Sequence, residues 1–256
     1  MSDIYEKFLE YLDRSEKVAF FGGAGVSTES GIPDFRSKDG LYNQHDVQFD
    51  RYTPEYLLSH TCLIRDPEVY YEFHRQKLDT ADIKPNRAHI YLAKLEEQGK
   101  LTGIVTQNID GLHQRAGSKK VYEIHGSAQR NYCMKCGKKY PADYIFKSKE
   151  AIPRCDCSGQ IRPDITLYEE PLPVDATRNA IDCISSADML IIGGTSLTVY
   201  PAASYIDYFR GKYLVIINRD ALHVRAGNRA EVLTVTEKIG EFFSKVAELQ
   251  NISLED

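Results

Sequence analysis

The stretch that decides the fold is VAFFGGAGVST, residues 18–28. Residues 18–21 are apolar and predict a short buried strand, and Gly22-Gly23 ends it. Glycines let the backbone turn sharply and approach a pyrophosphate closely, and a helix that begins after the loop offers free N–H groups to phosphate. The same pattern also occurs in plain strand–helix turns, so the loop alone leaves both interpretations open.

The loop lacks two features of the common dinucleotide-binding fingerprint. Thr28 stands at the third glycine position, and no strand ends in an acidic residue about 20 residues later, where a ribose-binding acid is expected. The chain continues instead with GIPDFR, residues 31–36. The loop is therefore not that of an ordinary dehydrogenase.

Short apolar runs alternate with helical patterns along much of the remaining chain. Further buried strands are predicted at residues 103–107, 121–124, 188–192, 213–217 and 231–235. Helices are predicted at residues 3–14, from the Asp66-Pro67 cap to about Leu78, from the Asn86 cap to Gln98, and from about Pro201. This alternation predicts an α/β fold with a mostly parallel sheet.

Two segments interrupt the alternation. Residues 34–85 contain no clear strand and many aromatic residues, and residues 127–160 have little apolar periodicity. We interpret both as insertions that together build a smaller domain facing the sheet. The predicted division is a sheet domain of residues 1–33, 86–126 and 161–256, a helical insertion of residues 34–85, and a module of residues 127–160.

Four of the six cysteines lie in two tight pairs, Cys133/Cys136 and Cys155/Cys157. Residues 137–154 separate the pairs, within the spacing of about 15–20 residues that paired-cysteine zinc sites show. Four thiolates favour a closed, tetrahedral, structural Zn²⁺ site. The alternative, a redox Cys-x-x-Cys, lacks a matching fold context here. Cys62 and Cys183 lie in helical or apolar contexts and are predicted to be buried packing residues.

The composition excludes some classes of protein. The 256 residues are 42% hydrophobic and 27% charged, with a formal charge of −5, which argues against a nucleic-acid binder and is compatible with a basic peptide partner. No run approaches the roughly 18 apolar residues that span a membrane, and the acidic start is unlike a signal peptide. We therefore expect a cytoplasmic monomer without a membrane or direct nucleic-acid partner.

Four motifs resemble those of the sirtuin family, in the family's order. They are GAGVSTESGIPDFRS (23–37), TQNIDGLH (106–113), His125-Gly126 and GTSL (194–197). The resemblance spans nearly the whole chain, and the compact length is similar to that of prokaryotic members. It implies a Rossmann-like parallel sheet domain with a smaller domain made of a helical insertion and a zinc-binding module. It also implies an NAD-dependent protein-lysine deacetylase, or deacylase, that releases nicotinamide and O-acyl-ADP-ribose.

The resemblance makes His125 and Asn108 the catalytic residues, with His125 as the base that activates a ribose hydroxyl. An imidazole titrates near neutral pH and suits this task, although a lone histidine is more often structural. His113 is the rival on position, but we expect it to pack or orient its helix. The NAD-binding residues that the resemblance implies are Gly23, Ala24, Gly25, Thr28, Asp34, Phe35, Arg36, Gln107, Asn108, Ile109, Asp110, Gly194, Thr195, Ser196, Asn218, Arg219 and Lys238.

Three departures from the family pattern stand out. The second cysteine pair is Cys-x-Cys where the family has Cys-x-x-Cys, and the shorter spacing would strain the turn. Residues 161–170 correspond to the stretch that pairs with the substrate backbone, and Tyr168-Glu169 replaces the more common Phe-Gly there. His74 and Lys77 stand where members that remove acidic acyl groups carry a Tyr-x-x-Arg pair. Because lysine lacks arginine's bidentate fork, we expect acyl-lysine proteins or peptides with acetyl or other neutral groups as substrates.

Two alternatives remain at this point. A mono-ADP-ribosyltransferase on the same scaffold would also begin by breaking the nicotinamide bond, although an intact His125 favours deacylation. A non-catalytic nucleotide-sensing or zinc-mediated binding module belongs to a different class. Nicotinamide release that depends on an acyl-lysine peptide would exclude that module.

Overall fold

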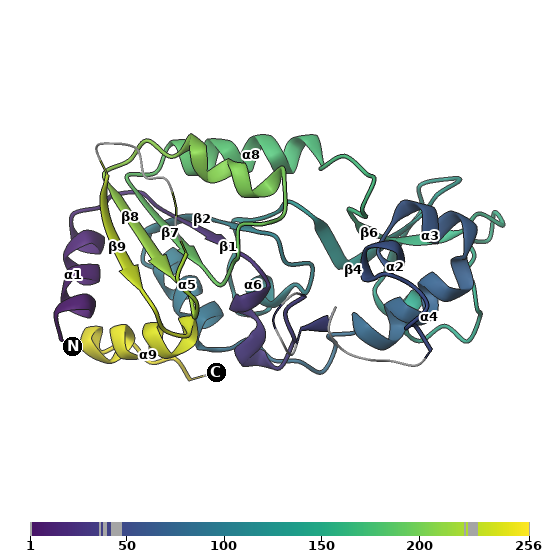
Figure 1. Ribbon diagram of the computed structural model, residues 1–256, viewed down its shortest axis with the longest axis horizontal. Coiled ribbons are helices and arrows are strands. Elements are labelled where there is room, and N and C mark those ends of the chain that lie inside the picture. The colour runs from purple at the N-terminus through teal and green to yellow at the C-terminus, as the bar shows by residue number, and fades with distance from the viewer. Residues whose placement is uncertain are drawn as a thin grey trace.

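The computed structural model describes residues 2–35, 37, 40–41, 48–222, 224 and 230–255. It consists of a larger part, in which helices cover both faces of a sheet, and a smaller part built from short helices and a second sheet (Figure 1). None of the helices in the described ranges is long and apolar enough to span a membrane.

The larger sheet is a doubly wound parallel sheet. Its strands are β1 (Val18–Gly22), β2 (Leu101–Thr106), β3 (Val121–Glu123), β7 (Met189–Gly193), β8 (Tyr213–Ile217) and β9 (Glu231–Val235). They lie in the order β3-β2-β1-β7-β8-β9 and every neighbouring pair is parallel. Counted along the chain this is the order 3-2-1-4-5-6 of dinucleotide-binding domains, which reverses between β1 and β7. The predicted parallel α/β sheet is confirmed.

The apolar run of β1 is explained by burial on both faces of the sheet. Val18 and Phe20 pack into the core on one face, and Ala19 and Phe21 into the core on the other. All four side chains are inaccessible to solvent. A strand that is buried on both sides reads as a continuous apolar run and not as an alternating one.

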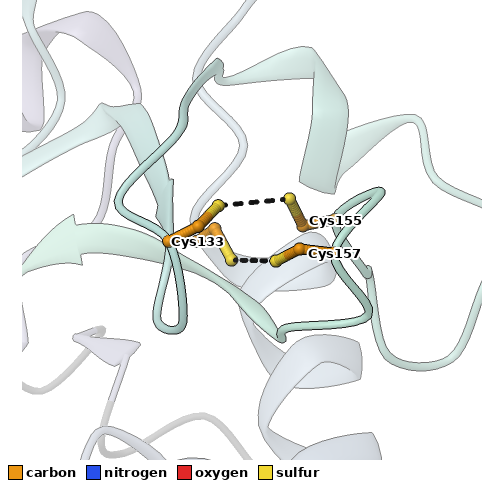
Figure 2. Close-up of side chains that lie close together, drawn as sticks. Cys133, Cys155 and Cys157 are labelled. Atoms are coloured by element: carbon orange, nitrogen blue, oxygen red, sulfur yellow. Dashed lines mark hydrogen bonds between the residues drawn. The ribbon is translucent and has the colours of Figure 1, made fainter.

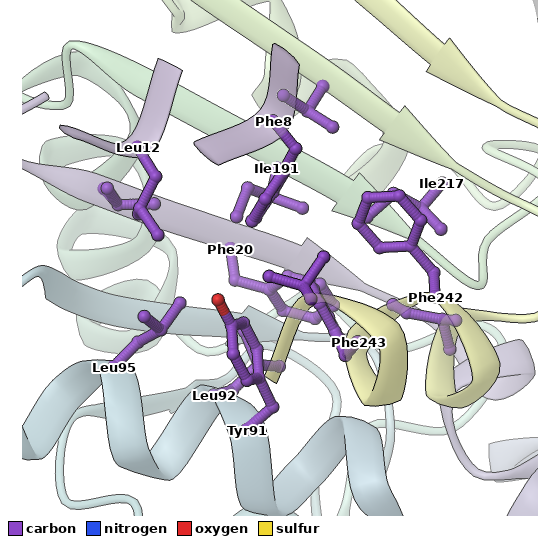
Figure 3. Packing of buried hydrophobic residues seen from close by; sticks show 14 of the residues in the cluster. Phe8, Leu12, Phe20, Tyr91, Leu92, Leu95, Ile191, Ile217, Phe242 and Phe243 are labelled. Atoms are coloured by element: carbon purple, nitrogen blue, oxygen red, sulfur yellow. The ribbon is translucent and has the colours of Figure 1, made fainter. Parts of the chain in front are cut away.

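Helices α1 (Ser2–Asp13), α5 (Arg87–Glu97) and α9 (Ile239–Gln250) cover one face, where Phe8, Phe20, Tyr91 and Phe243 meet (Figure 3). Helix α8 (Val174–Ser185) and the 3₁₀ helix η4 (Ala202–Tyr208) cover the other face. The cap predicted at Asn86 is confirmed, because its side chain accepts a hydrogen bond from the Ala88 N–H. The sequence patterns did not predict α8 or α9, and the helix expected near Pro201 is the 3₁₀ helix η4.

The smaller part contains the antiparallel strands β4 (Gly126–Cys133), β5 (Lys139–Pro141) and β6 (Ile161–Ile165), in the order β5-β4-β6. Its helices are α2 (Pro54–Leu57), α3 (His60–Arg65), α4 (Pro67–Lys77) and α7 (Asp143–Phe146). Its core holds Cys62, Leu63, Tyr70, Tyr71 and Ile161. Cys62 and, in the larger part, Cys183 are buried, as predicted.

The exact division into domains stays a prediction. Strand β6 belongs to the smaller sheet, whereas the predicted division assigns residues 161–256 to the larger domain. The reason is physical: Ile161 and Ile165 supply apolar side chains to the core of the smaller part, and the chain returns to the larger sheet only afterwards.

Candidate active site and metal centre

A cavity of about 570 Å³ lies where the strand order reverses. It collects residues that follow β1, β2, β7 and β8, the strand ends at which open α/β sheets bind ligands. Its volume lies within the usual range for a small-molecule site. The predicted residues that line it are Gly23, Ala24, Gly25, Thr28, Asp34, Phe35, Gln107, Asn108, His125, Gly194, Thr195, Ser196, Asn218, Arg219 and Lys238.

The loops after β1 and β7, which both line the cavity, contact each other through backbone atoms of glycine residues. After β1 the chain forms two short 3₁₀ turns, η1 (Ala24–Val26) and η2 (Thr28–Ser30). The Gly25 N–H donates to the Gly194 carbonyl oxygen at 2.8 Å, and a Cβ on Gly25 would lie 2.8 Å from that same oxygen. Gly194 has φ 56, and a Cβ there would lie 2.3 Å from the Val26 nitrogen. Only glycine fits at both positions, because any side chain would push the loops apart.

His125 follows β3 and is held by one hydrogen bond to the main chain. Its Nδ1 lies 3.0 Å from the Gln107 carbonyl oxygen. Because a carbonyl only accepts, Nδ1 must carry the hydrogen, and Nε2 is left as a proton acceptor in the neutral ring. Burial lowers the pKa of His125, and the bond to Gln107 opposes this shift in part. The imidazole is therefore neutral at neutral pH, as a general base must be.

Asn108 is tied to Ser27 and Asp110 in a buried network. The Asn108 Nδ2 donates to the Ser27 Oγ at 3.1 Å, and this hydroxyl donates to the Asp110 Oδ2 at 2.7 Å. The Leu112 N–H also donates to Asp110, at 2.8 Å. Burial raises the pKa of Asp110, while the bonds from Leu112 and Ser27 lower it. The network orients the Asn108 amide so that its carbonyl group is left to accept from a ligand.

His89 extends this network to the start of α5. The Asn86 N–H donates to the His89 Nδ1 at 3.3 Å, so the ring hydrogen sits on Nε2. That Nε2 lies 3.4 Å from the Ser27 Oγ. Ser27, which was not predicted, therefore joins the glycine-rich loop, α5 and the segment after β2.

Gln107 bridges two strand ends across β1. Its Nε2 donates to the Thr195 Oγ1 at 3.0 Å, and the Leu197 N–H donates to the same hydroxyl at 3.2 Å. This bond uses one of the two hydrogens of the amide nitrogen and fixes the orientation of the Gln107 side chain at the cavity wall. The segment after β7 is thereby fixed relative to the segment after β2.

Two predicted residues in the described ranges, Ile109 and Asp110, are not among those that line the cavity. Asp110 is buried and accepts a hydrogen bond from Ser27, and Ile109 packs partly buried against the cores of the smaller part. Arg36 lies outside the described residues. The predicted roles of Ile109 and Asp110 toward a ligand stay predictions, with Asp110 acting in this structure through Ser27.

The rival base His113 is a packing residue. It lies on α6 (Leu112–Arg115), is buried, and packs against Phe20 and His89. Among the described residues neither of its ring nitrogens has a hydrogen-bond partner. Burial lowers its pKa to about 3. It does not line the cavity, so position and environment both favour His125 as the base.

The four predicted metal ligands converge in the smaller part (Figure 2). Their Sγ atoms all lie within 4.8 Å of one another, with Cys133 3.5 Å from Cys157 and Cys136 3.6 Å from Cys155. Zn–S bonds of about 2.3 Å in a tetrahedron place the sulfurs about 3.8 Å apart. All four cysteines are free of disulfides. The donor set and its geometry fit a structural Zn²⁺.

The short Cys-x-Cys pair is accommodated by the residues after it. Ser158 adopts a left-handed backbone with φ 65, and Gly159 follows directly. A Cβ on Gly159 would lie 2.6 Å from the Cys133 Sγ, so glycine is required there. The expected strain from the shorter spacing stays a prediction, and Ser158 is a non-glycine residue at positive φ directly after the pair.

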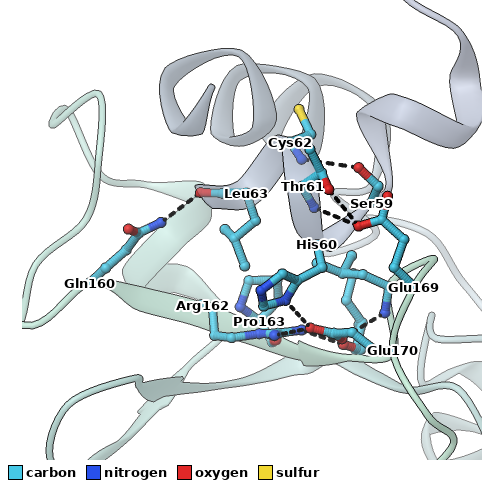
Figure 4. Close-up of polar contacts among 12 residues, drawn as sticks. Ser59, His60, Thr61, Cys62, Leu63, Gln160, Arg162, Pro163, Glu169 and Glu170 are labelled. Carbon is cyan, nitrogen blue, oxygen red and sulfur yellow. Dashed lines mark hydrogen bonds and ion pairs between the residues drawn. The ribbon is translucent and has the colours of Figure 1, made fainter. Parts of the chain in front are cut away.

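A polar cluster joins β6, the loop after it and α3 (Figure 4). Both guanidinium nitrogens of Arg162 contact Glu170, with Nη2 to Oε2 at 2.9 Å. The His60 Nδ1 lies 2.8 Å from the Glu170 Oε1, and the Leu167 N–H donates to Oε2 at 2.9 Å. Burial alone would raise the pKa of Glu170, but these partners, Arg162 above all, lower it to about 2. The loop 166–170 is therefore held in one shape.

A sequence profile of the Sir2 family matches residues 23–201. The NAD-dependent protein deacetylase of Clostridium perfringens is 53% identical over 249 residues, which cover 96% of this chain and 99% of that protein. The chain belongs to the Sir2 family. The NAD-dependent protein deacetylase of Clostridium acetobutylicum is 54% identical over 233 residues, covering 91% of this chain and 93% of that protein.

Solved structures of the Sir2 family share the fold over almost the whole chain. A Sir2 bound to an acetylated peptide superposes with a TM-score of 0.83 at 38% identity, covering 97% of this chain and 99% of that one. A Sir2 with a p53 peptide and NAD⁺ gives a TM-score of 0.80 at 40% identity and the same coverage. The Rossmann-like sheet and the smaller part thus form the fold of the family.

In this Sir2-family chain His74 lies away from the cavity. It is buried in the smaller part and its ring stacks on Phe146 at 5.0 Å between centroids. Neither His74 nor Lys77 lines the cavity. The expected preference for neutral acyl groups therefore stays a prediction.

Several residues that line the cavity were missed by the sequence analysis: Glu29, Ser37, Val199, Ile217, Asp220, Ala221, Leu222 and Ile239. Val199 and Leu222 follow the ends of β7 and β8, so a stricter use of the strand-end rule would have found them. Glu29 carries no such signal. Its carboxylate accepts from the Gly240 N–H at 2.7 Å, at the start of α9, a contact that only the tertiary structure creates.

Proposed function

We propose that this protein removes acetyl groups from lysine side chains in proteins, consumes NAD in doing so, and releases nicotinamide and O-acetyl-ADP-ribose. The observation that carries the proposal is His125, a neutral imidazole fixed through Nδ1 at the wall of a cavity at the reversal point of a doubly wound sheet. Membership of the Sir2 family supports the same activity.

NAD fits the cavity as the co-substrate. The glycine loop and the segment after β7 present backbone N–H groups and small hydroxyls, which suit the two phosphates. Asn218 follows β8 and lines the cavity, and we assign it to the adenosine ribose, which an acid after the second strand binds in ordinary dinucleotide-binding domains. Asn108 and Gln107 present amide carbonyls at the nicotinamide end of the cavity.

NAD supplies an electrophilic anomeric carbon, from which nicotinamide departs as the acyl oxygen attacks. His125 Nε2 then takes the proton from the ribose hydroxyl that attacks the carbon of the resulting imidate. Water then adds to that carbon, the bond to the lysine nitrogen breaks, and the acetyl group stays on the ADP-ribose while the lysine leaves as the free amine. Phe35 lines the cavity and excludes stray water from the anomeric carbon. Asn108, held by Ser27, orients the nicotinamide ribose. The zinc stays outside this chemistry, because four thiolates leave it no open position for water.

We assign the peptide substrate, as an added strand, to residues 161–170, which comprise β6 and the loop after it. The loop is held to α3 by the polar cluster, which pre-forms it for a partner. Sir2 structures with acetylated peptides support this class of substrate. The formal charge of −5 suits peptides and disfavours nucleic acid. We expect the protein to act as a monomer in the cytoplasm.

The test is incubation of the purified protein with NAD and a panel of acyl-lysine peptides, followed by mass spectrometry of both products. We expect free lysine peptide and acyl-ADP-ribose in equal amounts, with acetyl preferred to succinyl. ADP-ribose attached to protein would instead support the transferase alternative. NAD binding without nicotinamide release, with or without acyl peptide, would contradict the proposed activity.

A further inference from the structure

Glu169 has a backbone conformation that its side chain must stabilise. It is one of four described non-glycine residues with positive φ, at 77. A left-handed conformation disfavours residues with a Cβ, and the family more often has glycine at this position. A glutamate that persists there needs contacts of its own side chain.

Two donors from α3 supply those contacts. The Thr61 N–H and the Thr61 Oγ1 donate to the Glu169 Oε2 at 2.9 and 2.7 Å (Figure 4). The loop is also paired with this helix through its backbone, because Tyr168 donates to the Leu58 carbonyl at 3.0 Å and accepts from the His60 N–H at 3.1 Å. The carboxylate is therefore fixed in place. No donor from the described ranges reaches its Oε1, and the residue is exposed.

The surroundings of Glu169 carry an excess of negative charge. A groove of about 480 Å³ is lined by residues that include His60, Arg162, Asp164, Glu169 and Glu170. The Arg162 guanidinium is used by Glu170, and Arg130 is shared between Asp164 and Glu123. In the groove and directly beside it, four carboxylates thus meet two guanidinium groups and the His60 imidazole, which also contacts Glu170. Within the part of the chain that the structure describes, Glu169 is the one of the four without a cationic partner.

We propose that Glu169 determines specificity, and that it favours acetyl-lysine substrates with a second, unmodified lysine or an arginine close to the acetylated residue. The inference rests on the proposed function, which places the peptide along the loop that carries Glu169. In an added strand, side chains of the peptide project beside the loop at alternate positions. A carboxylate that is already immobilised loses little freedom when it pairs. An exposed pair of this kind changes kcat/KM by about two- to fivefold.

The test measures kcat/KM of the full chain on acetyl-lysine peptides that differ at a single position. That position, one or two residues to either side of the acetyl-lysine, holds Lys, Gln or Glu. We expect the Lys peptide to exceed the Gln peptide by about two- to fivefold at one or more positions, and the Glu peptide to be the poorest. The preference should shrink as salt is raised from 0.05 to about 0.5 M.

Three variants separate charge from structure. Glu169→Gln keeps an acceptor for Thr61 but removes the charge, and we expect the Lys-to-Gln ratio to fall to about one. Glu169→Gly removes the charge and suits the left-handed backbone, and we expect the same loss. Glu97→Gln removes one exposed carboxylate from the end of α5 and should keep the wild-type ratio. The Lys-to-Gln ratio of kcat/KM compares two peptides on the same variant. A partial loss of folded protein lowers both rates equally and therefore leaves this ratio unchanged.

Equal rates on Lys and Glu peptides in the wild type, or a preference that survives in Glu169→Gln, would overturn the inference while the deacetylase remained established by its products. Absence of acetyl-ADP-ribose with every peptide would instead remove the proposed function.

Discussion

His125 shows how one main-chain contact selects a chemical role. The bond from its Nδ1 to the Gln107 carbonyl decides the tautomer, and burial keeps the ring neutral. His113 is buried more deeply and makes no hydrogen bond within the described ranges. Two histidines that lie twelve residues apart in the chain thus have different surroundings, and His125 has the position and tautomer that the proposed base needs.

Replacement of His125 by alanine should remove the base without disturbing the cavity. We expect deacetylation to fall by about 10²–10⁴-fold, because general base catalysis contributes about that much. The affinity for NAD, measured by calorimetry, should change little. Wild-type turnover by His125→Ala would contradict the proposed mechanism.

Replacement of Ser27 by alanine should act on Asn108 and Asp110 together. The change deletes the hydroxyl that accepts from one and donates to the other, and a hydrogen bond to a charged group is worth about 1.5–3 kcal/mol. We expect kcat/KM for NAD to fall by about ten- to a hundredfold, with the melting temperature as the check on folding. Since Asp110 loses a donor, its pKa should rise, and the acidic limb of the pH profile should move to higher pH. An unchanged profile would contradict the network.

At the scale of elements, the zinc module depends on ligands from two separated loops. Cys133 and Cys136 lie at the end of β4 and just after it, while Cys155 and Cys157 precede β6. Strands β4 and β6 are paired, so the metal joins the loops at the ends of adjacent strands. Without it, four thiols would crowd together with only weak S–H hydrogen bonds between them.

Removal of zinc should unfold the smaller part and abolish activity indirectly. We expect one Zn²⁺ per chain by elemental analysis, and a strong chelator should reduce β-structure and activity together. Cys155→Ser should have the same effect, whereas Cys183→Ser, at a buried cysteine of the larger part, should keep the zinc. Retention of fold and activity after complete zinc loss would show that the cluster is not a structural metal site.

At the scale of the whole molecule, buried histidines link stability to pH. His74 and His113 are buried without hydrogen-bond partners in the described ranges, and burial lowers the pKa of each to about 3. In the unfolded chain these histidines have a pKa of about 6.5. As the pH falls, the unfolded state therefore takes up protons at a higher pH than the folded state does. The folded state is therefore favoured above about pH 6.5 and loses stability as the pH falls below that value.

Each of these histidines should contribute a slope of about 1.4 kcal/mol per pH unit below its unfolded pKa. Denaturant unfolding between pH 7.5 and 5 should show the free energy of unfolding falling as the pH is lowered. His74→Phe keeps a flat aromatic ring that can stack on Phe146. It should reduce the slope of the unfolding free energy against pH by the contribution of one histidine. An equal slope in this variant would mean that His74 is not neutral in the folded state.

The sequence by itself determined the local features whose chemistry depends on neighbours along the chain. Short strand-like runs marked every strand of the larger sheet, and β1, β7 and β8 are continuously apolar because they are buried on both faces. The spacing of the cysteines indicated the metal site, and the motifs around residues 23–37 and 106–113 indicated the family and most of the cavity. Helices α8 and α9 were missed although their apolar residues recur at helical spacing, as those of α1 do, so a stricter reading of the sequence would have found them.

Only the tertiary structure decided which of these features meet. The strand order brings the ends of β1 and β7 together although about 170 residues separate them, and this pairing of Gly25 with Gly194 shapes the cavity. It also placed β6 in the smaller sheet, Glu29 at the start of α9, and the Glu169 carboxylate on Thr61. The physical reason is the same in each case: hydrogen bonds and packing between distant segments depend on positions in space, which no local pattern of residues encodes.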